Sequence, residues 1–427
     1  MRQTDRSFRF DWITILIFLA LVVFGWFNIF SASTTLEFSS YFDLSQPYGK
    51  QLLFIILTVV LIVIILSLEA KFYERFSSII YILSLISLLG LFIFGKTVSG
   101  ATSWYGLGSV TIQPSEFAKA ATALAIAKYT SDLQTNIKAF SDQIKLFIII
   151  LIPAILILLQ NDMGSTVVYG AFFFVLFREG LPRVYLYLAA LFPITAILAL
   201  KFGIILSSII TVLLIALFYL YFLKSRKRNR FFKIMGLSIL MIIFSFGVKY
   251  IYQHSLPPHQ KDRISLWLRL EKDPDKLERM KKTYAYNLLE SEKAISSGGF
   301  WGKGFLEGTR TTGKFVPEQH TDYIFSTVGE EWGFIGTSIV VILFVLLLLR
   351  ILHLAELQKN QFSRVYGYGV ASIIFIHFFI NIGMVMGLIP TIGIPLPFFS
   401  YGGSGLWGFT ILLFIFIKLD SNRINEW

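Results

Sequence analysis

The sequence contains no cysteine, which excludes a disulfide framework and thiolate chemistry. Charged residues are also scarce: they make up 15% of the 427 residues, against about 25% in a typical soluble domain. Hydrophobic residues make up 55%, and apolar runs of about 20 residues recur along the chain. This balance excludes an ordinary soluble domain and predicts a polytopic membrane protein.

The charge that is present is mostly positive, with a formal net charge of +12. In membrane proteins such an excess is typical of cytoplasmic loops that face anionic lipid, so we predict no nucleic-acid partner. No small-residue cleavage site follows the first apolar run, which is therefore predicted to be a retained helix and not a signal peptide.

Twelve apolar runs are predicted to span the membrane as helices, which makes the fold class an all-α polytopic membrane protein. The predicted spans are residues 11–32, 50–68, 78–95, 114–130, 145–160, 164–178, 183–202, 204–223, 231–250, 321–351, 364–388 and 402–419.

The distribution of lysine and arginine predicts the orientation of these spans. The basic N-terminus, the segment KSRKRNR at 224–230 and the C-terminal tail all fall on one side, which is predicted to be cytoplasmic. The same parity predicts four segments on the outer face: 33–49, 96–113, 251–320 and 389–401. Because 251–320 has no span of its own and no separate soluble domain follows, residues 1–427 are interpreted as one membrane domain with a large extracytoplasmic loop.

The first outer motif is GATSWYGLGSVTIQPSEFAKA at 100–120. Trp104 is an interfacial aromatic residue, and Pro114 suits the first turn of a helix. Glu116 and Lys119 are spaced i, i+3 and can pair on one helix face. This pair is either a structural salt bridge or a functional pair at the membrane boundary, and the sequence leaves both open.

Two further motifs combine polar residues with helix starts. Asp162, in QNDMGSTVVYG, separates two apolar runs and is interpreted as a helix cap. The stretch at 296–325 is rich in glycine, lysine and arginine, a combination that allows tight turns and can cradle phosphate. It ends in PEQHTD, where either Thr321 or Asp322 caps the next helix, or the cluster serves proton transfer or a metal, although its spacing matches no standard zinc pattern.

The last outer motif is GLIPTIGIPLPFFSYGGSGL at 387–406. Pro390, Pro395 and Pro397 forbid a regular helix here. Irregular backbone at membrane depth is tolerated where it is buried or lines a cavity, so this segment predicts a polar or lipid-accessible groove.

Taken together, the motifs QPSE, SSGGFWGKGFLEGT, VPEQHTDYIF, GEEWGFIG and IPLPFFSYGGSG resemble the SEDS family (shape, elongation, division and sporulation). They occur in the family's order and cover most of the chain. The residues of these motifs are most similar to those of the elongation-type members, and the division-type members are near relatives. The resemblance implies a core of ten spans, so the apolar runs within 183–250 would include an inserted pair.

The resemblance also implies an activity. It implies a peptidoglycan glycosyltransferase that polymerises lipid II into a growing glycan strand on the outer side of the bacterial cytoplasmic membrane. The implied partners are a class B penicillin-binding protein and other membrane proteins of the elongation complex, and a divalent cation, Mg²⁺ or Mn²⁺, is implied by the family alone.

The family's functional positions transfer to residues of this sequence. The catalytic aspartate corresponds to Asp273 of EKDPD, which we interpret as the general base. The implied substrate-binding residues are Trp104, Gln113, Glu116, Lys119, Arg263, Glu318, His320, Thr321, Asp322 and Ser400. Residues suited to neutralise the substrate diphosphate are Arg263, Lys119, Lys303 and Arg310.

Besides the inserted pair, the chain departs from the family pattern in three places. KLERMKKTYAYN replaces a glycine-containing stretch after EKDPD, Asn161 replaces a proline, and Ser103 replaces an arginine.

Two other functions stay open at this point. A lipid II flippase would suit a polar groove among twelve helices, but it predicts ionisable residues near the bilayer midplane and inverted repeats, and neither is clear. A non-catalytic scaffold for a penicillin-binding protein predicts that the loop carboxylates are dispensable. By itself, EKDPD would be interpreted as a solvated connector.

Overall fold

The computed structural model describes residues 10–34, 40–98, 100–108, 110–221, 227–283, 286–317 and 319–423. The chain divides into two compact units, which we call the first unit (Met1–Leu181 with Asn287–Trp427) and the second unit (Pro182–Tyr286). The interpretation of residues 1–427 as one domain stays a prediction.

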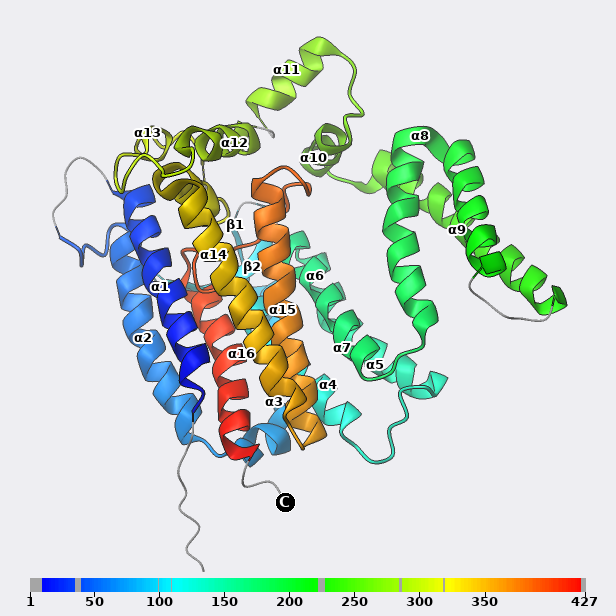
Figure 1. Cartoon of the computed structure of the whole chain (residues 1–427), viewed down its shortest axis with the longest axis horizontal. Helices are drawn as coiled ribbons and strands as arrows, with labels where there is room; N and C mark the ends of the chain where they lie inside the picture. Colours follow the sequence, from blue (N-terminus) through cyan, green and yellow to red (C-terminus); the bar gives the residue numbers. More distant parts are fainter. Residues whose placement is uncertain are drawn as a thin grey trace, which may run out of the picture. The chain divides into compact units, whose positions relative to one another are not determined.

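The first unit is helical and is drawn in blue, cyan, yellow and red in Figure 1. Its helices are α1 (Trp12–Ser33), α2 (Pro47–Ser67), α3 (Ala70–Phe94), α4 (Pro114–Thr130), α5 (Phe140–Leu159), α6 (Met163–Val168), the 3-10 helix η1 (Tyr169–Ala171), α7 (Phe172–Arg178), α12 (Tyr286–Gly298), α13 (Thr309–Thr312), α14 (Ile324–Glu356), α15 (Gln361–Val385) and α16 (Gly403–Asn422). The first residue of α12, Tyr286, is the last residue of the second unit.

The second unit holds the remaining helices: α8 (Arg183–Tyr221), α9 (Lys227–Tyr250), the π-helix η2 (Ile251–Ser255), α10 (Pro258–Leu268) and α11 (Pro274–Lys282). Its long helices pack together, and Thr195, Thr211 and Met241 are buried in it. The predicted outer loop 251–320 is therefore mostly helical, and it runs through both units.

Nine helices of the described residues are long and apolar enough to cross a membrane. α4 adds a shorter buried helix, and 163–178 adds an apolar helix broken by η1. Gly203, with φ 80°, breaks α8 at the boundary between two predicted spans. Helices of the described residues therefore lie in all twelve predicted stretches, and the all-α polytopic membrane architecture is confirmed.

The core of the first unit lies around α4, α15 and α16. α4 packs against α3, α15, α16 and α5, and most of its residues are buried. Alanines dominate its buried positions: Ala118, Ala120, Ala121, Ala123, Ala125 and Ala127. Small residues let neighbouring helices approach closely, as in other membrane bundles. This places the polar start of α4 at the centre of the unit.

A small antiparallel sheet, which the sequence patterns did not predict, precedes α4. Its strands, in the order β1-β2-β3, are β1 (Lys96–Val98), β2 (Ala101–Leu107) and β3 (Val110–Ile112). Trp104 of β2 pairs with Lys96 of β1, and Tyr105 pairs with Ile112 of β3. The hairpin leads directly into Gln113 and α4, so it fixes Trp104 close to the helix start.

Candidate active site

A cavity of about 490 Å³ lies in the first unit, where α2, the sheet, the start of α4, the 395–402 segment and α16 meet. Five of the predicted substrate-binding residues line it: Trp104, Gln113, Glu116, Thr321 and Ser400. Much of the remaining wall is apolar and includes Leu53, Phe54, Leu396, Phe398 and Phe409. The fold therefore brings three distant sequence motifs to one site, with a volume typical of small-molecule pockets.

Glu116 and Lys119 form the ion pair that their spacing predicts. Lys119 Nζ donates to both carboxylate oxygens of Glu116 at 2.8 Å, and both side chains are buried. Glu116 belongs to the cavity wall, whereas Lys119 lies outside it, with Nζ 4.8 Å from the centroid of the Phe409 ring. Lys119 thus neutralises and orients an acid that faces the cavity.

His377 of α15, which is not among the predicted site residues, completes this buried cluster. Its Nε2 lies 2.9 Å from Lys119 Nζ, and its Nδ1 lies 3.3 Å from the Pro395 carbonyl oxygen. Because an ammonium group only donates, Nε2 is the acceptor and Nδ1–H points to Pro395. All three N–H groups of Lys119 therefore have acceptors. An ionisable residue inside an apolar span was the available signal.

Asp162 links the start of α6 to the start of α4. Its Oδ1 accepts the Ser165 N–H at 2.9 Å, which confirms the predicted helix cap. Its Oδ2 accepts the Gln113 side-chain amide at 2.9 Å and the Ser165 hydroxyl at 2.8 Å. The cap therefore also fixes the orientation of Gln113 at the cavity.

The proline-rich segment before α16 is irregular, as predicted. The Ser400 hydroxyl donates to the Thr321 carbonyl at 2.7 Å. Asn381 of α15 donates to the carbonyl groups of Asp322 at 2.8 Å and Ile394 at 2.6 Å. These bonds hold the segment beside PEQHTD, so Ser400 shapes the cavity wall while its own hydroxyl is engaged within the fold.

The helix cap predicted at Thr321 or Asp322 is wrong. α14 begins at Ile324, its N-cap position is Tyr323, and no side chain accepts a hydrogen bond there. The carbonyl groups of Thr321 and Asp322 are instead bound by the side chains of Ser400 and Asn381. These tertiary hydrogen bonds keep the stretch in turns and delay the helix start.

The other two residues predicted from PEQHTD have different outcomes. Glu318 lies outside the described residues. The His320 ring packs edge-on against Tyr401, with 5.2 Å between centroids, and its carbonyl accepts the Tyr401 N–H at 2.9 Å. Tyr401 lines the cavity, so His320 contacts a residue of the cavity wall without being part of that wall.

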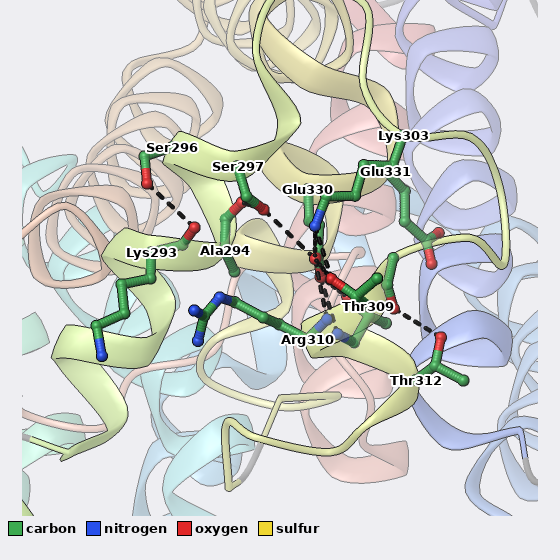
Figure 2. A network of polar contacts seen from close by, with 12 residues as sticks. Lys293, Ala294, Ser296, Ser297, Lys303, Thr309, Arg310, Thr312, Glu330 and Glu331 are labelled. Carbon is green, nitrogen blue, oxygen red and sulfur yellow. Dashed lines mark hydrogen bonds and ion pairs between the residues drawn. The ribbon is translucent and has the colours of Figure 1, made fainter.

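Glu330 of α14, in the GEEWGFIG motif, organises the glycine-rich stretch (Figure 2). It is fully buried, and its carboxylate accepts Lys303 Nζ at 2.6 Å and the backbone N–H groups of Arg310 at 2.9 Å and Thr311 at 2.8 Å. The Arg310 guanidinium pairs with Glu290. Two of the cations predicted for the diphosphate are therefore neutralised by carboxylates of the protein.

The glycines of this stretch let its backbone approach α14. Gly302 has φ 84°, and a Cβ there would lie 2.1 Å from the Glu331 carbonyl oxygen. The next two N–H groups, of Lys303 and Gly304, donate to the carbonyls of Glu330 and Glu331 at 3.0 Å. The predicted phosphate cradle thus uses these backbone donors for its own packing.

Asp273 lies in the second unit, at the start of α11. Its exposed carboxylate accepts the Asp275 N–H at 3.1 Å and caps the helix. The neighbouring Glu271 pairs with Lys276 at 2.5 Å and accepts the Asp273 N–H at 3.2 Å. The hydrogen bond from Lys276, and to a smaller extent the one from the Asp273 N–H, holds the pKa of Glu271 below its usual value. Arg263 lies on α10 of the same unit.

A resident metal does not fit the residues that the structure describes. No group of three or more histidine, aspartate or glutamate side chains is arranged there to hold an ion. In the cavity wall, both oxygens of Glu116 already accept from Lys119. Mg²⁺ prefers near-octahedral oxygen coordination, so we assign no catalytic step to a metal.

The family model of the FtsW/RodA/SpoVE cell cycle proteins matches residues 11–208 and 206–425. The chain belongs to this family. The peptidoglycan glycosyltransferase RodA of Treponema pallidum is 31% identical over 441 residues, covering 97% of this chain and 98% of that protein. The peptidoglycan glycosyltransferase MrdB of Escherichia coli is 29% identical over 396 residues, covering 92% of this chain and 88% of its own length.

The fold is also found in a solved structure of a peptidoglycan synthase complex that coordinates polymerization and crosslinking. The matching chain of that complex is 23% identical to this chain and superposes with a TM-score of 0.70. The match covers 98% of this chain and 99% of the other chain. At this identity the likeness shows the fold. The resemblance to the SEDS family is confirmed.

Proposed function

We propose that this chain polymerises lipid II into β-1,4-linked glycan strands at the outer face of the cytoplasmic membrane during cell elongation. Its enzyme class is that of its relatives, the peptidoglycan glycosyltransferases. The observation that carries the proposal is the cavity of the first unit. It combines Trp104, Gln113 and Glu116, which suit sugar hydroxyl and amide groups, with an apolar wall that suits a prenyl chain.

Glycosyl transfer from a lipid diphosphate requires removal of one proton and departure of one leaving group. Asp273 takes the proton from the sugar 4-hydroxyl of the acceptor lipid II. The hydroxyl oxygen attacks the anomeric carbon of the growing strand, the bond from that carbon to the phosphate oxygen breaks, and undecaprenyl diphosphate leaves with inversion. A positioned general base contributes about 10²–10⁴-fold to such a step.

Strand extension with labelled lipid II in detergent tests this function. We expect the purified chain, mixed with its crosslinking partner, to produce long glycan strands. Detergent removes the bilayer that a flippase needs, so extension there supports a polymerase. A chain that moves lipid II across vesicle membranes but extends no strand in detergent would contradict the proposal.

The partner and the cellular role follow from the same proposal. We propose a class B penicillin-binding protein as partner, supported by the fold shared with a chain of a peptidoglycan synthase complex. Elongation is favoured because the relatives described above are RodA and MrdB. Depletion should therefore produce round cells, whereas filaments would indicate the division role. Other elongation-complex membrane proteins are proposed partners on the resemblance alone.

A requirement for Mg²⁺ or Mn²⁺ is likewise proposed from the resemblance. Because the described residues offer no cage, any such ion would be held mainly by substrate phosphates. Strand extension with and without EDTA, followed by addition of Mg²⁺, measures this requirement.

A further inference from the structure

Lys50, in the first turn of α2, is the basic side chain of the cavity wall. It is half-buried, and its backbone N–H donates to the Gln46 carbonyl at 3.2 Å. Its ammonium group forms no hydrogen bond or ion pair with the residues that the structure describes. It belongs to none of the sequence motifs described above.

The position of Lys50 is difficult to explain by stability. A cation in the first turn of a helix meets the positive end of the helix dipole, which is unfavourable. The other charged residue of the wall, Glu116, is already neutralised by Lys119. The cavity therefore carries an uncompensated positive charge at Lys50, and it should attract an anionic ligand.

The cations predicted for the substrate diphosphate are placed elsewhere. Lys119 is held by Glu116 and His377, Lys303 by Glu330, and Arg310 by Glu290. Arg263 belongs to the second unit. Within the cavity of the first unit, these ion pairs leave Lys50 as the cation available to a ligand.

The next residues on the same face of α2 are apolar. Leu53 and Phe54 follow Lys50 at i+3 and i+4 and also line the cavity. In the proposed topology α2 begins at the outer surface, so these two side chains lie about one turn deeper in the membrane. An ammonium group near the surface above an apolar wall matches an amphiphile with an anionic head and a prenyl tail.

We infer that Lys50 binds the diphosphate of a prenyl-diphosphate-linked ligand, with Leu53 and Phe54 against the first isoprene units. This inference rests on the proposed function and names the ligand group that one residue of its cavity recognises. Ammonium–phosphate hydrogen bonds are charge-assisted and stronger than neutral ones. Both the lipid-linked glycan substrate and the released undecaprenyl diphosphate carry this group.

Binding of farnesyl diphosphate and of farnesol to the purified full chain in detergent, with EDTA present, tests the inference. We expect the wild type to prefer the diphosphate. Lys50→Gln should weaken farnesyl diphosphate binding about 10- to 100-fold, the range for a hydrogen bond to a charged group, and leave farnesol binding unchanged. Lys50→Arg should retain most of the preference.

Lys71→Gln is the matched control, because Lys71 is an exposed lysine in the first turn of α3 and is not part of the cavity wall. It should leave both affinities unchanged. Unchanged farnesol binding also shows that a variant is folded. The inference is overturned if the wild type shows no preference for the diphosphate, if Lys50→Gln keeps the preference, or if Lys71→Gln loses it equally.

Strand extension separates this inference from the proposed function and distinguishes the two ligands. If the wild type extends strands while Lys50→Gln keeps its diphosphate affinity, only the assignment of Lys50 fails. If the wild type extends no strand, the proposed function fails, whatever Lys50 binds. A raised KM for lipid II in Lys50→Gln indicates the substrate diphosphate, whereas weaker inhibition by undecaprenyl diphosphate at unchanged KM indicates the product.

Discussion

At the scale of single residues, the two proposed acidic groups have different surroundings. Glu116 faces the cavity, but both of its oxygens accept from Lys119. Asp273 is exposed, and its hydrogen bond in the second unit is the helix cap at Asp275. A general base needs an oxygen that can reach a proton, which favours Asp273 for proton transfer and Glu116 for holding the substrate.

Asp273→Asn should separate catalysis from capping. Asparagine caps a helix about as well as aspartate but is not a base, so strand extension should fall by at least about 10²-fold while α11 stays intact. Asp273→Ala should lose activity and also about 1 kcal/mol of cap energy. Extension rates and thermal melting of both variants measure these effects, with Asp275→Asn as a neighbouring control. Full activity in Asp273→Asn would exclude the base assignment.

His377 should act as a positioning residue through Lys119. His377→Leu leaves one N–H group of a buried ammonium without an acceptor, which costs about 1–3 kcal/mol and should loosen Glu116. We expect KM for lipid II to rise more than kcat falls. His377→Gln supplies an acceptor and should restore KM. If His377→Leu and His377→Gln have the same melting temperature, KM and kcat, then His377 only fills space.

At the scale of elements, α14 and the glycine-rich stretch form one structure. The carboxylate of Glu330 takes the place of a phosphate among backbone N–H groups and Lys303, and the carbonyls of α14 accept from the glycine-rich backbone (Figure 2). A stretch that looks like a phosphate cradle in sequence is in this unit an internally satisfied loop.

Glu330→Ala should destabilise this element strongly. It leaves the Lys303 ammonium and two backbone N–H groups without their acceptor, at a cost of about 3–5 kcal/mol. Thermal melting of the purified chain, and faster proteolysis within 299–313, should report the loss. Glu292→Ala, an exposed acid on α12, is the matched control and should melt like the wild type. Equal melting of the two variants would refute this role.

At the scale of the whole molecule, the orientation in the membrane is the property to test. The absence of cysteine allows single-cysteine labelling without removing native thiols. Ser296→Cys on α12 and Gln134→Cys after α4 are both exposed positions. We expect a membrane-impermeant maleimide to label Ser296→Cys in intact cells, and Gln134→Cys only after lysis. The reverse pattern would invert the proposed topology.

The sequence by itself determined the membrane class, the positions of the long apolar helices and the motifs of the site. It did so because long apolar runs have few other structures available and because Glu116 and Lys119, or Asp162 and its helix, interact over three or four residues. The sheet carrying Trp104 was missed because its strands are short and lie in what looks like a connector.

Only the tertiary structure decided which charges remain available. Lys303 and Arg310 are predicted as diphosphate ligands by their type and side of the membrane, yet Glu330 and Glu290, which are distant in the sequence, neutralise them. The pairing of Lys119 with Glu116 follows from their spacing, but the contact of Lys119 with His377 does not. Lys50 has no motif and still reaches the cavity. Ion pairs between segments that are distant in the sequence depend on which side chains the packing brings within about 4 Å, and that proximity is not encoded in local spacing.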